Sequence, residues 1–563
     1  MPFEEYSATE EARPFVRRSR EPEQHTMNQT QTQLTSERNT TEMSLRVYNT
    51  LTREKEDFQT IAPGKVGMYL CGPTVYKPSH IGHMVGPVIF DTIKRYLTYV
   101  GYDVTYVINI TDVDDKLINK ANELGRTVES LAQEMTQDYF DNLLTMGVDT
   151  VDLFPYATKH IGEMLEMIGT LVEKDHAYPL DGDVYFEVTK DDDYGKLSGR
   201  NIEDTMAGTR VEAASAKRNA ADFALWKKSK PGEPCWESPW GPGRPGWHIE
   251  CSAMSIKYLG ESFDIHGGGL DLMFPHHENE LAQAECCTGK TFARYWMHNG
   301  LMQASGEAGK VGGGHSADGD LVEEQAAQEA GKLAGSKGAA SVKLLFEKFT
   351  PETVRFFLLA THYRSPIDFS EERIAETEKS IEGFYRLFET VERITGESVY
   401  DVTPQTTRES SIKLDGEDIT FLAEIARFRD RFLETMNDDF NTGGAVGILF
   451  EMRKRINGFI SKNKLDSGES NEAAVGDLKL SVTLLRELAA LIGVFRQPIV
   501  KAGASAAGGD DEFAGGLMQL IIDVRAMART NKHFELADKI RDGLNELKVT
   551  LEDGNEGTRW RRD

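Results

Sequence analysis

Two histidines stand where a Pro-containing loop gives way to a helix-forming stretch, in the four residues His80, Ile81, Gly82 and His83. The first turn of a helix has unbonded backbone N–H groups and about half a positive charge, which suits a phosphate group. Gly82 lets the backbone approach a ligand closely, and the two imidazoles add donors that could stabilise charge on a transferring phosphoryl group. On these residues alone, simple capping of the helix by two histidines remains an alternative.

A second set of residues has the chemistry of a metal site. His276 and Glu280 of HHENE are four residues apart, so a helix places both on one face. Cys71 follows a predicted buried strand, and Cys251 lies in GWHIECSAMS. Two cysteines, a histidine and a glutamate form a ligand set that suits Zn²⁺. Without the cysteines, an ordinary surface pair of His276 and Glu280 would be the better interpretation.

Cysteine usage and the amino terminus bear on the compartment. Five cysteines in 563 residues are too few and too scattered for a disulfide scaffold, so reduced thiols or metal ligands are expected. Adjacent Cys286 and Cys287 would point in different directions on the HHENE helix and are interpreted as inert thiols. The first residues lack the apolar core of a secretory signal, and no apolar run is long enough to span a membrane. A cytoplasmic protein without a membrane segment is expected.

The elements around Cys71 predict where a ligand binds. Residues 67–71 read as a buried strand, 81–100 as a helix and 103–110 as another strand. Such a strand, helix, strand unit is almost always right-handed and makes its two strands parallel. Ligands bind beyond the carboxyl ends of parallel strands. The loop after Cys71 is therefore the expected site, and an α/β fold class follows.

Charge limits the partners. Acidic residues number 91 against 64 basic ones, for a formal net charge of −27, which excludes a nonspecific nucleic-acid coat protein. From residue 517 to the end, nine basic residues balance nine acidic ones, so this segment carries none of the acidic excess. It ends in Arg559, Trp560, Arg561 and Arg562, where the indole could stack on a base and the guanidinium groups could contact phosphates. A frayed tail is the alternative.

Longer motifs carry a resemblance to a known family. The chain resembles cysteinyl-tRNA synthetases, which are class I aminoacyl-tRNA synthetases, in LCGPTVYKPSHIGH, NITDVDDKLINKANE, GRPGWHIECSAMS, FDIHGGGLDLMFPHHENELAQ, THYRSPIDFS, DDFNT and the terminal GTRWRR. The resemblance spans about residues 45 to 562. It implies a Rossmann-type parallel-sheet catalytic domain with a connective insertion, followed by a mainly α-helical carboxy-terminal anticodon-binding region.

The implied domain boundaries follow composition and pattern. A disordered extension is expected over 1–43 and the catalytic domain over 44–150 and 236–304, interrupted by the connective insertion at 151–235. A Gly- and Ala-rich insertion at 305–341 precedes a junction domain at 342–372 and a helical bundle at 373–500. A linker at 501–516 leads to the anticodon-binding module at 517–563.

The resemblance also assigns the amino-acid site. It implies that Cys71, Cys251, His276 and Glu280 hold one zinc ion, and that Gly72, Thr74, Trp247 and His266 line the substrate pocket. A substrate cysteine can give zinc a soft thiolate ligand, whereas serine keeps its proton and offers a weak hydroxyl. Discrimination by a coordination bond should greatly exceed what one methylene gives in a pocket, so no editing site is expected.

The implied reaction has two steps. The carboxylate of L-cysteine attacks the α-phosphorus of ATP, bound with Mg²⁺ at His80, Ile81, Gly82 and His83, and gives cysteinyl-adenylate and pyrophosphate. The 2′-hydroxyl of the terminal ribose of tRNA(Cys) then attacks the acyl carbon. Contacts to the tRNA are expected from the segment Arg559 to Arg562, and the resemblance favours a monomer.

One family motif is missing. Class I synthetases usually carry KMSKS on a loop whose lysine neutralises the departing pyrophosphate, and this chain has only GKVGGG and GKLAGSKG in that region. Measured back from Thr350, the second segment lies at close to the expected distance. Lys337 is therefore the expected catalytic and ATP-binding replacement, ahead of Lys332 and Lys310. Alternatively, all three are solvated lysines of a linker.

The sequence alone is also compatible with two other functions. A related enzyme could activate cysteine at the same site and pass it to a small-molecule amine, although such an acceptor needs no anticodon module. A catalytically silent zinc- and RNA-binding relative would explain the degraded lysine motif. Cysteine-dependent exchange of pyrophosphate into ATP separates the silent protein from both enzymes.

Overall fold

The computed structural model describes residues 44–201, 217–304, 341–412, 414, 420–467, 471–498, 510–530, 533–546, 549–554 and 557–562. The chain forms two compact units, which comprise residues 1–498 and 499–563. Among the helices of the described residues, none is long and apolar enough to cross a membrane.

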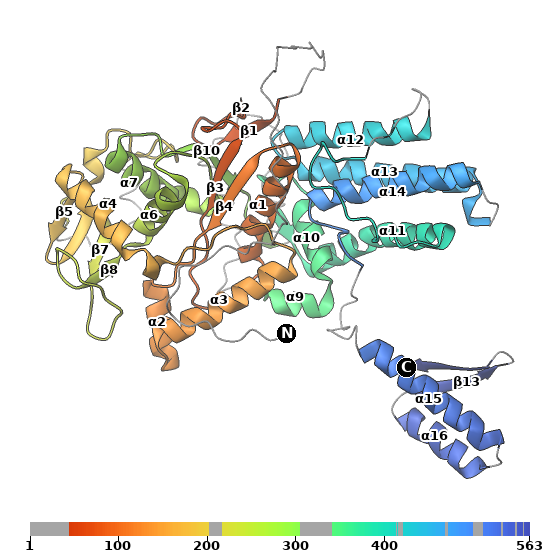
Figure 1. Cartoon of the computed structure of the whole chain (residues 1–563). Coiled ribbons are helices and arrows are strands. Elements are labelled where there is room, and N and C mark those ends of the chain that lie inside the picture. Colours follow the sequence, from red (N-terminus) through yellow and green to blue (C-terminus); the bar gives the residue numbers. More distant parts are fainter. Residues whose placement is uncertain are drawn as a thin grey trace, which may run out of the picture. The chain divides into compact units, whose positions relative to one another are not determined.

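A four-stranded parallel sheet lies at the centre of the first unit (Figure 1). Its strands are β3 (Lys65–Leu70), β4 (Asp103–Ile108), β9 (Phe263–Gly269) and β10 (Ala293–Asn299), in the order β10-β9-β3-β4. Helix α1 (Gly82–Tyr99) connects β3 to β4. The predicted strand, helix, strand unit is therefore confirmed, and Cys71 directly follows β3 at the carboxyl edge of the sheet.

Both faces of this sheet are buried, as expected for parallel strands. Alternate residues such as Met68, Ile265 and Met297 pack into a core shared with α1 and with the helices of the carboxy-terminal half. The opposite face presents Tyr69 and Trp296 to a second core, which also receives residues of α4 (Ile161–Glu173), α6 (Trp247–Leu259) and α7 (Glu278–Thr288). The metal-site candidates lie on this second face.

The chain between β4 and β9 of the central sheet forms helices and a second, antiparallel sheet. After α2 (Asp115–Leu124), α3 (Val128–Thr145) and α4, four antiparallel strands follow in the order β5-β6-β7-β8. These strands are β5 (Ala177–Leu180), β6 (Asp183–Phe186), β7 (Phe223–Lys228) and β8 (Gly243–Pro245). The antiparallel sheet runs to Pro245, past the expected boundary at 235, and delivers the chain directly to Trp247 at the start of α6.

Amphipathic helices form the rest of the first unit (Figure 1). They are α9 (Val342–Lys348), α10 (Pro351–Leu359), α11 (Glu371–Thr395), α12 (Phe421–Asn437), α13 (Thr442–Lys462) and α14 (Glu472–Leu491). The predicted apolar stripe of α11 is buried at Ile381, Phe384, Phe388 and Val391. Short strands join this half to the sheet region, since β11 (Met302–Ala304) pairs with β12 (Ile367–Phe369). β1 (Arg46–Asn49) pairs with β2 (Glu54–Asp57), and Arg46 of β1 forms a backbone bridge with Asp438.

The second unit contains α15 (Asp510–Thr530), α16 (Phe534–Glu546) and an antiparallel pair of strands, β13 (Val549–Gly554) and β14 (Gly557–Arg562). Sequence pattern predicts only helices here, with GTRWRR as their end. Instead, GTRWRR is a strand in which Trp560 is opposite Leu551. The preceding VTLEDG supplies the backbone partners that make a strand of this short charged segment.

Candidate functional site

Four predicted metal ligands converge at the carboxyl edge of the central sheet. Cys71 Sγ lies 3.3 Å from Glu280 Oε1, and His276 Nε2 lies 2.9 Å from the same oxygen. Cys251 Sγ lies 3.6 Å from His276 Nε2. All four donor atoms lie within 4.8 Å of one another. The four residues that the sequence grouped as one set therefore lie together in the structure.

Each of these residues is placed by a different element. Cys71 directly follows β3, Cys251 lies in the second turn of α6, and Glu280 lies in the first turn of α7. His276 lies in the irregular turn Met273–His277 that precedes α7, but its position four residues before Glu280 still brings the two side chains together. Contacts between α6 and α7 and the end of β3 hold the three elements in place.

Within this buried cluster, each ionisable group shifts the pKa of its neighbours. Burial by itself would lower the pKa of His276, but Glu280 and Cys251 outweigh it and raise that pKa to about 10. Burial would raise the pKa of Glu280, but His276 and His266 outweigh it and bring the pKa well below its usual value. The pKa of the Cys71 thiol is raised well above its usual value by burial and by Cys251. The imidazole of His276 is therefore protonated, which shows that the surrounding carboxylate and thiols favour a positive charge at this position.

The donor set fits a tetrahedral zinc ion. With Zn–S of about 2.3 Å and Zn–N of about 2.0–2.1 Å, a tetrahedron separates sulfur from nitrogen by roughly 3.6 Å. That is the separation of Cys251 Sγ from His276 Nε2. A second combination, Cys71, His266, His277 and Glu280, also places its donors within 4.8 Å. The first combination is the better one for zinc, because it offers two sulfur ligands instead of one.

Several buried histidines surround the four ligands, and sequence reasoning assigned only one of them. His266, predicted to line the pocket, places Nε2 3.2 Å from Glu280 Oε2 and 3.6 Å from Cys71 Sγ. His248 Nδ1 lies 2.9 Å from His276 Nδ1, which leaves Nε2 of His276 directed at the cluster. Burial lowers the pKa of His248 well below its usual value, so its ring is neutral and can accept that hydrogen bond.

The loop after Cys71 is held by polar residues that sequence reasoning also missed. The backbone N–H of Gly72 donates to Asn109 Oδ1 at 2.8 Å, and Asn109 Nδ2 donates to Thr111. Thr111 donates to Glu250 at 2.9 Å, and its backbone pairs with Thr74. A side chain at Gly72 would place Cβ 1.7 Å from the carbonyl oxygen of Asn109, so only glycine fits. In the sequence, the polar residues Asn109 and Thr111 directly after β4 could have indicated these contacts.

Trp247 lies over the donor cluster. Its ring stacks on that of His276, with centroids 4.2 Å apart and planes at 25°. The Lys116 ammonium lies 5.9 Å from the indole centroid. Of the predicted substrate-pocket residues, Trp247 and His266 contact the donor side chains, and Gly72 directly follows Cys71.

The His80 to His83 segment occupies the amino terminus of α1, as predicted. Helix α1 begins at Gly82, and its first turn contains no acidic residue. The two imidazoles stack with centroids 3.7 Å apart, and the backbone N–H of His80 donates to His83 Nδ1 at 3.4 Å. A Cβ at Gly82 would lie 3.0 Å from the His80 ring, so glycine permits this stacking. The helix terminus and both rings thus form one donor-rich surface.

Lys310, Lys332 and Lys337 lie outside the described residues. Ser341, the first described residue after them, forms a backbone bridge with His80, and the N–H of Val342 donates to Ser79. Arg559, Trp560, Arg561 and Arg562 lie in β14, where the backbone alone is described.

Comparisons with known proteins point to one family. Residues 57–310 match the family of class I (C) tRNA synthetase catalytic domains, and residues 431–496 match the DALR domain. A cysteine–tRNA ligase of Pelotomaculum thermopropionicum is 43% identical over 530 residues, covering 92% of this chain and 100% of the relative. One from Thermococcus onnurineus is 42% identical over 92% of this chain and 99% of its own length.

Solved structures agree on the fold. A Mycobacterium tuberculosis methionyl-tRNA synthetase bound by methionyl-adenylate superposes with a TM-score of 0.52 at 15% identity, over 76% of this chain and 91% of that one. Identity this low establishes the class I fold alone. Together with the extent of the sequence matches, these comparisons establish that the chain belongs to the cysteine–tRNA ligase family of class I aminoacyl-tRNA synthetases.

Proposed function

We propose that this chain ligates L-cysteine to tRNA(Cys) at the expense of ATP, and that a zinc ion held by Cys71, Cys251, His276 and Glu280 selects the amino acid. The observation that carries the proposal is the meeting of those four donors within 4.8 Å of one another, beside the loop of Gly72 and Thr74. Family membership supplies the ligase activity, and the donor chemistry supplies the metal.

The four ligands and their neighbours select the substrate. When bound, zinc would supply a Lewis acid that prefers a thiolate to a neutral hydroxyl. Trp247 then covers the amino acid from the side of His276, on which its ring stacks. The Asn109–Thr111–Glu250 chain of hydrogen bonds fixes the loop that faces the substrate, so less ordering is required when cysteine binds.

Activation of cysteine takes place at the start of α1. Its amino terminus and the imidazoles of His80 and His83 bind the phosphates of ATP, accompanied by Mg²⁺, and stabilise charge as the α-phosphorus is attacked. The carboxyl edge of the sheet brings this surface and the donor cluster together, since both Cys71 and the loop to His80 follow β3. The carboxylate of a bound cysteine can therefore reach the nucleotide.

Lys337 is proposed as the lysine that neutralises the departing pyrophosphate. It precedes Ser341 by four residues, and Ser341 pairs with His80. Four residues of extended chain span at most about 14 Å. This length of chain is short enough for Lys337 to reach the ATP site, whereas Lys310 lies 31 residues before Ser341.

Replacing Lys337 by alanine should slow cysteinyl-adenylate formation by about 10- to 100-fold, the scale expected when one charge-stabilising donor is lost from a transition state. Pre-steady-state measurement of adenylate formation checks this. Lys310→Ala and Lys332→Ala serve as matched controls and should keep the rate of the unaltered enzyme. A normal rate in Lys337→Ala would remove Lys337 from the mechanism.

The terminal unit is proposed to recognise the anticodon. Strand β14 contains Arg559, Trp560, Arg561 and Arg562, residue types that bind unstacked bases and phosphates of RNA. Residues 517–563 carry no net charge to repel a polyanion, unlike the chain as a whole. We propose that the protein works as a monomer in the cytoplasm.

Cysteine-dependent exchange of pyrophosphate into ATP, followed by charging of tRNA(Cys), tests the function. Exchange with cysteine should exceed exchange with serine by at least about 10⁴-fold, as in sites that lose an essential polar interaction with the wrong substrate. Exchange without charging of tRNA would favour a small-molecule acceptor. Absence of exchange would contradict the ligase and favour the silent relative.

A further inference from the structure

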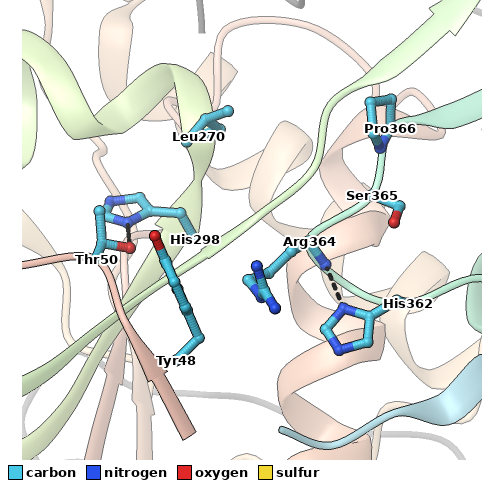
Figure 2. Close-up of a pocket in the computed structure, with 8 residues that line it drawn as sticks. All are labelled: Tyr48, Thr50, Leu270, His298, His362, Arg364, Ser365 and Pro366. Carbon is cyan, nitrogen blue, oxygen red and sulfur yellow. Dashed lines mark hydrogen bonds between the residues drawn. The ribbon is translucent and has the colours of Figure 1, made fainter. Parts of the chain in front are cut away.

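A pocket outside the proposed catalytic site lies at the β10 edge of the central sheet (Figure 2). Its volume is about 200 Å³. Its lining residues come from β1 and the turn after it, from β10, from the turn after β9 and from the loop of THYRSPIDFS. They are Tyr48, Thr50, Leu270, His298, His362, Arg364, Ser365 and Pro366. The mechanism uses none of these side chains.

A buried carboxylate fixes Arg364 in this pocket. Asp439 of DDFNT is fully buried and accepts a hydrogen bond from Arg364 Nε at 2.8 Å. The same carboxylate accepts from the backbone N–H of Tyr48 and from the hydroxyl of Tyr363. The guanidinium also lies over the Tyr48 ring, 4.2 Å from its centroid. Two motifs far apart in sequence thus meet to hold one guanidinium in a single orientation.

The terminal nitrogens of the Arg364 guanidinium can still donate hydrogen bonds to a ligand. Within the described part of the chain, no hydrogen bond engages either terminal nitrogen of Arg364 or the hydroxyl of Ser365. Figure 2 shows the Arg364 side chain in the middle of the pocket, between Tyr48 and His362. A guanidinium anchored through Nε presents its two remaining nitrogens as a planar fork, the geometry that matches a phosphate.

The other lining groups leave Arg364 as the positive charge of the pocket. His298 uses both ring nitrogens, toward Thr50 and toward His277, each at 2.8 Å. Burial lowers the pKa of His298 to about 3, and burial also lowers the pKa of His362 despite nearby Asp439. Both rings are therefore neutral at physiological pH, and among the eight lining residues no carboxylate opposes an incoming anion.

From this geometry we infer that the pocket binds one phosphate group through Arg364 and Ser365. Two sources share that chemistry, the backbone of tRNA and free phosphate. The tRNA is the source favoured by position, because His277 contacts both His298 in the pocket wall and His266 beside the donor cluster. The terminal ribose of tRNA has to reach the acyl group of a cysteine bound at that cluster, and a phosphate site this close to it suits the strand that carries the ribose. The inference rests on the proposed ligation of cysteine to tRNA.

Two variants and one matched control test the pocket. Arg364→Gln removes the charge, and Ser365→Asp places a negative charge in the pocket at an exposed position without touching Asp439. Thr361→Asp adds the same charge on the same loop at an exposed residue that does not line the pocket. Affinity for tRNA(Cys) is measured by equilibrium binding over a range of salt concentrations, and cysteine-dependent pyrophosphate exchange is measured without tRNA.

Both pocket variants should weaken tRNA binding by about 5- to 30-fold, the scale of one charge-assisted hydrogen bond at a half-exposed site. In Arg364→Gln the slope of log affinity against log salt should fall by about 0.7 to 0.9, corresponding to one lost phosphate contact. Thr361→Asp should change neither quantity. Exchange should stay normal in all three, which separates this result from a failure of the proposed function.

A merely structural role for Arg364 would leave the salt slope unchanged, and Ser365→Asp would then bind tRNA as the control does. That pair of results would exclude the tRNA backbone. Titration of the tRNA-free protein with inorganic phosphate covers the other source: saturable binding that is lost in both pocket variants assigns the pocket to free phosphate. No effect on tRNA binding and no binding of inorganic phosphate would overturn the inference.

Discussion

Replacing Cys251 by alanine should remove the bound metal and reduce cysteine-dependent pyrophosphate exchange by about 10³-fold or more. Cys251 lies 3.6 Å from His276 Nε2 and is almost fully buried, so nothing in the surrounding core replaces its sulfur. The loss of one of four protein ligands weakens metal binding steeply, and the free energy of metal binding also stabilises the fold around the site. The metal content should fall from about one zinc per chain to below about one tenth.

Elemental analysis of the purified protein and the exchange assay measure these two effects. Cys286→Ala is the matched control, since Cys286 lies on α7 with Glu280 but belongs to neither donor combination. Burial raises the pKa of its thiol to about 12, so it remains protonated and inert. The control should keep its zinc and its activity. Full metal retention in a Cys251→Ala, His276→Ala double variant would refute the assignment of these ligands.

Replacing His83 by alanine should lower the rate of cysteinyl-adenylate formation by about 10²- to 10³-fold, the loss measured when one preorganised transition-state donor is removed. His83 lies in the first turn of α1, stacked on His80, where the backbone N–H groups already favour a phosphate. Rapid quench measurement of the adenylate checks the rate. Because His83 belongs to neither donor combination, the variant should keep its zinc.

The outcome for His83 separates chemistry from structure. A fall in rate with normal zinc content and normal thermal unfolding is the predicted result. An unchanged rate of adenylate formation would show that the stacked imidazoles only cap α1, the alternative that the sequence alone left open.

The catalytic core was predictable because local signals and one topological rule act together there. The strand expected at 67–71 is observed at Lys65–Leu70, and the helix expected at 81–100 is observed at Gly82–Tyr99. Once β3 and β4 are parallel, ligands bind beyond their carboxyl ends, which places Cys71 at the site. The spacing of His276 and Glu280 then brings two candidate metal ligands together.

Other features depend on contacts between distant segments, which no local pattern reports. Glu250 reaches Thr111 across 139 residues, and Asp439 reaches the backbone of Tyr48 across 391. Each pairing needs the tertiary packing of several elements before the two groups meet. Strand β14 was missed for a related reason, since its charged sequence becomes a strand only through pairing with β13.

Spectroscopy of the metal in the presence of substrate tests the central claim most directly. The zinc is replaced by Co²⁺, and the sulfur-to-cobalt charge-transfer absorption is recorded before and after L-cysteine or L-serine is added. Added L-cysteine should strengthen the absorption in a saturable manner, as expected for one more thiolate ligand, and L-serine should leave it unchanged. An absorption that cysteine never alters would contradict selection of the amino acid by the metal.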